Sequence, residues 1–155
     1  MGKETERKFL VRKDLWYALK KPAGTSITQA YLVNEPEKVI RIRVTGLNGF
    51  ITIKGPITGA TRLEYEYPVP REEALEILDH FTRNRIEKIR YNIEFYSHLW
   101  EIDEFFGEND GLILAEIELK NQEESFEKPS WLGEEVTYDH RYYNSYLAEN
   151  PFKYW

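Results

Sequence analysis

Apolar and polar residues alternate along most of the chain, and a period of two predicts β-strands. In the segment KVIRIRV, Ile40, Ile42 and Val44 share one face, while Arg41 and Arg43 share the other. Gly, Pro or Asn turns separate the alternating segments. The pattern predicts eight strands, over residues 4–9, 26–34, 38–46, 49–56, 62–69, 87–96, 98–106 and 112–121.

Helical spacing of apolar residues is confined to a few segments. It predicts a helix over 14–21, capped by Asp14, and a second over 71–83 with an acidic first turn. Asp139 can cap a short helix over 140–148. Eight strands in this order predict a mainly β (α+β) fold, an eight-stranded antiparallel closed barrel with a few external helices.

The bulk composition restricts the class of protein. A chain of 155 residues fits one domain spanning 1–155. The net charge of -6 disfavours a nucleic-acid partner, and the lack of cysteine excludes disulfides and thiolate metal sites. No apolar run reaches the roughly 18 residues of a membrane span, and the charged opening MGKETERK does not resemble a signal peptide. We therefore expect a soluble cytoplasmic protein. The sequence does not indicate its oligomeric state.

The charged strand faces are segregated by sign. Residues 41 and 43, and 88 and 90, are basic, while 64 and 66, 101 and 103, and 116 and 118 are acidic. Solvated charge on half-exposed strands would also give alternation. Segregation, and the preference for Arg, instead favour a concave face where cations bind phosphate oxygens and carboxylates hold divalent cations.

Several motifs, in order along the chain, resemble the CYTH domain, or triphosphate tunnel metalloenzyme, family. Its Glu-x-Glu-x-Lys signature matches Glu4, Glu6 and Lys8. The likeness continues through RIR (41–43), TIKGP (52–56), LEYEYPV (63–69), KIRY (88–91), WEIDEF (100–105), LAEIEL (114–119) and GEEVTYDHRYYNSYLA (133–148). The sequence looks like the short bacterial type of this family, which resembles inorganic tripolyphosphatases.

The resemblance implies a tunnel that binds a triphosphate together with Mg²⁺ or Mn²⁺. The implied metal-binding carboxylates are Glu4, Glu6, Glu116 and Glu118, with Glu64 available to a second metal. The implied phosphate-binding cations are Lys8, Arg41, Arg43, Lys54, Lys88 and Arg90. The implied catalytic residues are Lys8, Arg41 and Arg43, with Glu66 and Asp103 positioning a second metal or the attacking water.

The implied reaction is metal-dependent hydrolysis of a phosphoanhydride bond. Because the chain has no obvious module for recognising a nucleoside, inorganic tripolyphosphate is the first choice, with pyrophosphate and phosphate as products. A nucleoside or thiamine triphosphatase and a class IV-type adenylyl cyclase are alternatives. A non-catalytic module that binds polyphosphate or nucleotide is an alternative of another class, which the presence of both charge sets disfavours.

Overall fold

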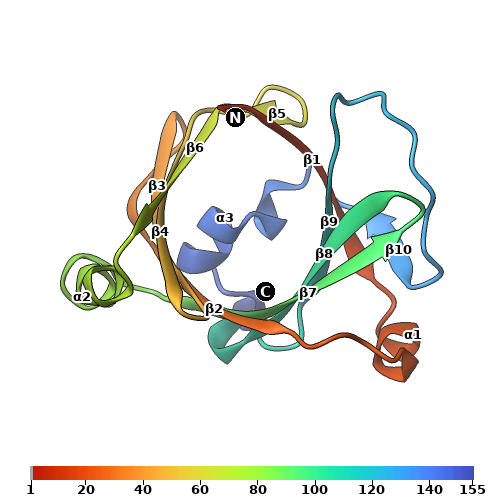
Figure 1. Ribbon diagram of the computed structural model, residues 1–155, viewed down its shortest axis with the longest axis horizontal. Coiled ribbons are helices and arrows are strands. Elements are labelled where there is room, and N and C mark those ends of the chain that lie inside the picture. Colours follow the sequence, from red (N-terminus) through yellow and green to blue (C-terminus); the bar gives the residue numbers. More distant parts are fainter. Residues whose placement is uncertain (1) are drawn as a thin grey trace.

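The computed structural model describes residues 2–155. Its strands form one strongly curled antiparallel sheet (Figure 1). Its path of hydrogen-bonded neighbours runs β10-β1-β9-β8-β7-β2-β3-β4-β6, with β5 paired to β1 outside this path. The strands are β1 (Glu4–Val11), β2 (Thr25–Glu35), β3 (Lys38–Thr45), β4 (Asn48–Lys54), β5 (Thr61–Arg62), β6 (Glu64–Val69), β7 (Ile86–Phe95), β8 (His98–Phe106), β9 (Ile113–Glu118) and β10 (Leu132–Glu135).

The prediction of eight strands in a closed barrel is wrong in two respects, since the sheet has ten strands and does not close into a ring of paired strands. The segment predicted as one strand over 62–69 is interrupted at Leu63, which splits it into β5 and β6. A tight turn precedes it, with Gly59 at φ +65°. The N–H of Glu64 donates to the carbonyl of Gly2 at 3.1 Å, so backbone contacts bridge the two edges without a continuous ladder.

Strand register brings the predicted charged faces together. Lys8 lies opposite Glu116, and Glu6 opposite Glu118, in the pairing of β1 with β9. Arg90 lies opposite Asp103 in the pairing of β7 with β8. Directly opposed residues of paired strands point to the same side of the sheet. All these residues therefore share the inner face of the curl.

Short helices cover the outside of the sheet and one of its ends. The α-helices are α1 (Lys13–Ala18), α2 (Arg71–Phe81) and α3 (Asn144–Glu149), and the 3₁₀ turns are η1 (Gly107–Asn109), η2 (His140–Tyr142) and η3 (Phe152–Tyr154). Helix α2 buries Ala74 and Leu78 against the outer side chains of Ile42 and Val44. The first helix starts one residue before Asp14 and lacks a side-chain cap, so the predicted Asp14 cap is wrong.

The main core lies outside the curl, so its interior is free for polar groups. Trp16 from α1, Trp100 from β8 and Trp131 pack edge to face, with ring centroids 5.8 Å apart in each of the two contacts that Trp131 makes. All three side chains are buried. The apolar faces predicted from alternation are thus covered here by α1 and by the segment before β10.

The C-terminal segment crosses one end of the curl, where α3 is visible through the ring in Figure 1. Leu147 and Ala148 are buried against Leu112, Leu114 and Val136. The predicted helix over 140–148 is divided into η2 and α3, and the Asp139 carboxylate accepts a hydrogen bond from the N–H of Arg141 as a cap. Within residues 2–155, no helix has the length and apolarity to cross a membrane.

Candidate functional site

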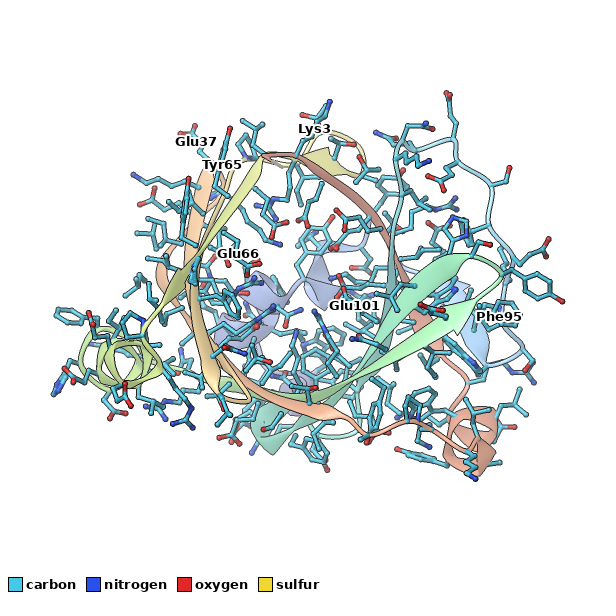
Figure 2. All side chains as sticks on the ribbon, viewed as in Figure 1. Lys3, Glu37, Tyr65, Glu66, Phe95 and Glu101 are labelled. Atoms are coloured by element: carbon cyan, nitrogen blue, oxygen red, sulfur yellow. The ribbon has the colours of Figure 1, made fainter. Side chains whose placement is uncertain are left out.

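The curled sheet encloses a charged cavity of about 530 Å³. Within residues 2–155, eight cationic and seven anionic side chains line it, and Figure 2 shows charged side chains filling the ring. Twelve of the thirteen predicted site residues lie on its wall: Glu4, Glu6, Lys8, Arg41, Arg43, Lys54, Glu64, Glu66, Lys88, Arg90, Glu116 and Glu118. The remaining residue, Asp103, lies beneath the wall and is fully buried.

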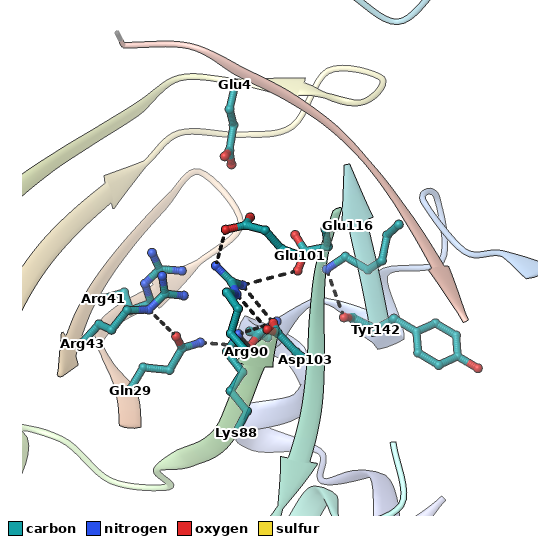
Figure 3. Close-up of polar contacts among 12 residues, drawn as sticks. Glu4, Gln29, Arg41, Arg43, Lys88, Arg90, Glu101, Asp103, Glu116 and Tyr142 are labelled. Carbon is teal, nitrogen blue, oxygen red and sulfur yellow. Dashed lines mark hydrogen bonds and ion pairs between the residues drawn. The ribbon is translucent and has the colours of Figure 1, made fainter. Parts of the chain in front are cut away.

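Asp103 anchors two of the cations (Figure 3). Its Oδ1 accepts a hydrogen bond from Arg90 Nε at 2.7 Å, and its Oδ2 accepts one from Arg90 Nη2 at 2.9 Å. Lys88 Nζ also lies 2.8 Å from Oδ2. Burial raises the pKa of Asp103, but Arg90 and Lys88 outweigh burial and hold the pKa well below its usual range. Asp103 is therefore an ionised counter-ion that fixes the two cations above it.

Lys88 is 2% exposed, and its burial dominates its charge state. Burial lowers the pKa of Lys88 to about 7, although Asp103 opposes that effect. Arg90 behaves differently, because Asp103, Glu101 and Glu116 together raise its pKa well above the ordinary value despite burial. At this end of the cavity, burial thus disfavours the charged form of Lys88, whereas neighbouring carboxylates keep Arg90 charged.

Two arginines on β3 carry donors that the protein leaves unused. Arg41 Nη2 donates to Thr52 Oγ1 at 3.1 Å, but its buried Nε has no hydrogen-bond partner. Arg43 Nε donates to Gln29 Oε1 at 2.8 Å, and no carboxylate in residues 2–155 lies within 4.0 Å of its guanidinium. Burial, followed by the charges of Arg41 and Arg90, lowers the pKa of Arg43 to about 9. The nearest carboxylate contact of Arg41 is a long one, with Nη2 3.8 Å from Glu66 Oε1. Desolvated guanidinium groups that make no hydrogen bond to a carboxylate favour an anionic ligand.

Carboxylates crowd the opposite part of the wall. Burial and a hydrogen bond with Glu64 raise the pKa of Glu4 to about 7, although Lys54 Nζ lies 2.9 Å from its carboxylate. Burial, Glu116 and Glu4 raise the pKa of Glu6 well above the ordinary value. Such crowding stores electrostatic repulsion that a bound cation would relieve.

Glu116 is the exception among the crowded carboxylates. Burial raises the pKa of Glu116, but Lys8 and Arg90 outweigh it and lower the pKa to about 2. Burial lowers the pKa of Lys8, but the charges of Glu116 and Glu6 outweigh burial, so the pKa of Lys8 lies above its usual value. Among residues 2–155, no three acidic or histidine side chains already converge as a metal site.

The cavity also contains residues to which the sequence assigned no role. Arg62 lies on its wall and donates twice to the carbonyl of Gly55, at 3.0 and 2.6 Å. Arg62, Glu64 and Glu66 stand at alternate positions of the predicted strand, and this spacing could have placed Arg62 on the same charged face. Glu101 accepts a hydrogen bond from Arg90 Nη1 at 3.2 Å; alternation placed it on an acidic face with Asp103, but it was not among the predicted site residues.

Three further residues reach the wall from the C-terminal segment: Tyr143, Asn144 and Ser145. They lie between η2 and the first turn of α3, where the chain has no strand periodicity. No pattern in the sequence therefore signalled that they would enter the cavity.

Comparison with known proteins gives a consistent assignment. The CYTH domain family matches residues 2–145. An inorganic triphosphatase of Acetivibrio thermocellus is 48% identical over 154 residues, which cover 99% of this chain and 97% of that protein. An inorganic triphosphatase of Nitrosomonas europaea is 33% identical over 149 residues, covering 94% and 96% of the two chains.

A solved crystal structure of an inorganic triphosphatase superimposes with a TM-score of 0.65 at 32% identity, covering 94% of this chain and 93% of that one. The family match extends from the residues before β1 into α3, and thus includes every strand that contributes to the cavity wall. The resemblance recognised from the sequence motifs is confirmed, and the chain belongs to the CYTH domain family.

Proposed function

We propose that this protein hydrolyses inorganic triphosphate to pyrophosphate and phosphate inside the charged cavity. The observation that carries the proposal is the pair Arg41 and Arg43. They line the cavity together with six further cations and make no hydrogen bond to a carboxylate among residues 2–155. The names of the two relatives, both inorganic triphosphatases, support the same reaction.

The charge balance of the wall supports a substrate that binds together with a cation. Eight cations and seven anions on the wall, counted over residues 2–155, nearly neutralise one another when all are ionised. A polyanion entering alone would contact the cations and be repelled by the carboxylates. A triphosphate accompanied by a divalent cation satisfies both sets, and a cavity of about 530 Å³ is within the usual size of a small-ligand site.

The cations on the wall would bind and neutralise the phosphate chain. We assign this role to Lys8, Arg41, Arg43, Lys54, Lys88 and Arg90. Phosphoryl transfer passes through a loose, in-line transition state, so rate enhancement comes mainly from positioning and charge stabilisation. Lys8, Arg41 and Arg43 would stabilise the charge that develops on the transferred and leaving groups.

The carboxylates of the wall fit a divalent cation in their chemistry, and dependence on such a cation is general for the family. Their donors are oxygens only, which suits Mg²⁺ or Mn²⁺. The residues that would hold the cation are Glu4, Glu6, Glu64, Glu116 and Glu118. When bound, it would neutralise phosphate oxygens and make water more acidic. Burial and neighbouring carboxylates raise the pKa values of Glu4 and Glu6, and a cation bound there would favour their ionised forms.

Glu66 is the better placed of the two acidic residues proposed to position water. Its carboxylate lies inside the ring in Figure 2 and accepts a hydrogen bond from Thr52 Oγ1 at 3.0 Å. Asp103 does not line the cavity, so we propose that it acts by holding Arg90 and Lys88 rather than by contacting water. The chain would work as one domain spanning 1–155, since strands from both ends form the wall.

Phosphate release from tripolyphosphate, ATP and pyrophosphate, with Mg²⁺, Mn²⁺ or EDTA, tests the proposal. We expect metal-dependent release from tripolyphosphate that is much faster than release from ATP. Arg41→Ala should abolish most of that turnover, whereas Lys153→Ala, which changes an exposed pair with Glu108, should not change it. Equal rates on ATP and tripolyphosphate, or full activity of Arg41→Ala, would refute the assignment.

A further inference from the structure

Residues 142–144 of the C-terminal segment contact the cations at the closed end of the cavity. The carbonyl of Tyr142, labelled in Figure 3, accepts a hydrogen bond from Lys8 Nζ at 3.2 Å. The same ammonium lies 5.2 Å from the ring centroid of Tyr143. The Asn144 side chain accepts a hydrogen bond from Lys88 Nζ at 2.9 Å. The segment that covers the end of the curl is thus attached to the phosphate-binding cations themselves.

Asn144 lies at the centre of this attachment. Its Oδ1 also accepts a hydrogen bond from Gln29 Nε2 at 2.9 Å, and Gln29 Oε1 in turn accepts one from Arg43 Nε at 2.8 Å. Gln29 is fully buried, so solvent has little access to the hydrogen bonds that its side chain makes. One amide oxygen therefore connects Lys88 on β7 with Arg43 on β3, across the strand β2 that separates them.

The chemistry of the partners fixes how the amide is oriented. An ammonium group only donates hydrogen bonds, so the atom of Asn144 nearest Lys88 must be the carbonyl oxygen. The NH₂ group is then left over on a residue that lines the cavity. That group can add a neutral donor to a phosphate oxygen.

The acceptor, Asn144 Oδ1, belongs to an uncharged amide, and this affects how much positive charge Lys88 and Arg43 keep for a ligand. Lys88 already has one carboxylate partner, Asp103, at 2.8 Å. Arg43 has none within 4.0 Å among residues 2–155. An amide oxygen holds such cations in place and leaves their charge available to an anion, whereas a second carboxylate would neutralise it.

We infer that Asn144 is a positioning residue for the triphosphate site, which orients Lys88 directly and Arg43 through Gln29 without neutralising either cation. The inference rests on the proposed function for the identity of the ligand. It assigns to the C-terminal segment a part in substrate binding, in addition to closing the cavity.

Two variants and a matched control test this role. Asn144→Ala removes the acceptor, and Asn144→Asp keeps its shape and both hydrogen bonds but adds a negative charge. Asn150→Ala changes an exposed asparagine just after α3, whose side chain contacts only the carbonyl of Tyr146 among its hydrogen-bond partners in residues 2–155. The readouts are the Kd for tripolyphosphate by calorimetry, with EDTA and with Mg²⁺, the kcat and KM of phosphate release, and the Tm.

We expect both Asn144 variants to raise the Kd and KM about 10-fold or more. Asn144→Ala removes a hydrogen bond to a charged group, and the added carboxylate of Asn144→Asp neutralises the charge of Lys88. The Tm of Asn144→Asp and every parameter of Asn150→Ala should stay at the wild-type value. A wild-type Kd in Asn144→Asp would overturn the inference, as would losses of Tm and affinity in Asn144→Ala that Asn144→Asp fully restores. Those results would leave only a packing role.

The Kd also separates this inference from the proposed function. Tight binding of tripolyphosphate by the wild type without turnover would refute hydrolysis, and the two variants would still report on positioning. If the wild type bound tripolyphosphate under neither condition, no phosphate site would exist to position, and the inference would fall together with the proposed function.

Discussion

Asp103→Asn removes the charge beneath the cavity while keeping the shape of the side chain. In the wild type, Asp103 is fully buried and accepts two hydrogen bonds from Arg90 and contacts Lys88 at 2.8 Å. Removing one partner of a buried ion pair costs about 3–5 kcal/mol, because the remaining charge is left unpaired in a poorly solvated place. The variant should therefore be strongly destabilised.

The structure places the expected loss at the lower end of that range. Arg90 keeps Glu101 at 3.2 Å and Glu116 at 4.0 Å as alternative partners. Lys88 has a pKa of about 7 even with Asp103 present, so without that carboxylate it can lose its proton instead of staying buried as an unpaired cation. We expect the free energy of unfolding to fall by about 3 kcal/mol.

Urea unfolding at pH 7.5 followed by fluorescence measures this loss. A fall of about 3 kcal/mol corresponds to a decrease in Tm of roughly 6–12 °C for a domain of this size. Asp139→Asn provides the matched control, because Asp139 pairs with Arg141 at the surface and should give no measurable change. A stability of Asp103→Asn equal to that of the wild type would refute the reasoning that Asp103 is an essential counter-ion.

Four further predictions concern the core, one strand junction and the ligand site. Trp16→Ala should lower the free energy of unfolding by about 3–5 kcal/mol in urea titrations, because the ring is fully buried. Arg7→Ala should cost no more than about 1 kcal/mol in the same titrations, since its two hydrogen bonds to Glu135, at 2.7 and 2.5 Å, are part-exposed. Arg43→Lys should lower kcat/KM for tripolyphosphate about 100-fold, because an ammonium cannot reproduce the planar fork of donors, and a loss below threefold would count against its role. EDTA should abolish phosphate release, and added Mg²⁺ or Mn²⁺ should restore it; release that persists in EDTA would contradict the metal requirement.

Much of the cavity wall was predictable because its residues follow the period-two rule. Glu4, Glu6 and Lys8 face the interior for the same geometric reason as Arg41 and Arg43, since alternate side chains on a strand share one face. That rule needs no knowledge of which strands are neighbours. Strand alternation therefore predicted which charged residues line the cavity, before the fold was known.

Depth along the cavity was not predictable in the same way. Asp103 shares its face with Glu101, yet Asp103 is buried beneath the wall while Glu101 lines the cavity. The difference arises because the C-terminal segment closes one end, and Asn144 enters there from a stretch without periodicity. Closure of the sheet was also mispredicted, because the interruption at Leu63 and the short pairing of β5 with β1 depend on tertiary geometry.

The pairing of β1 with β9 and β10 has a consequence for how the protein folds. Residues 6–10 pair with residues 114–118, and the N–H of Val136 donates to the carbonyl of Lys8 at 2.8 Å. Contacts between such distant parts of a chain raise its contact order and slow folding, because a long loop must close before the contacts form. During synthesis, the meander of β2, β3 and β4 can form early. Strand β1 can pair with β9 and β10 only after those two strands have been synthesised. The Glu4, Glu6 and Lys8 wall of the cavity is therefore synthesised before the strand with which it pairs and is among the last parts of the cavity to assemble.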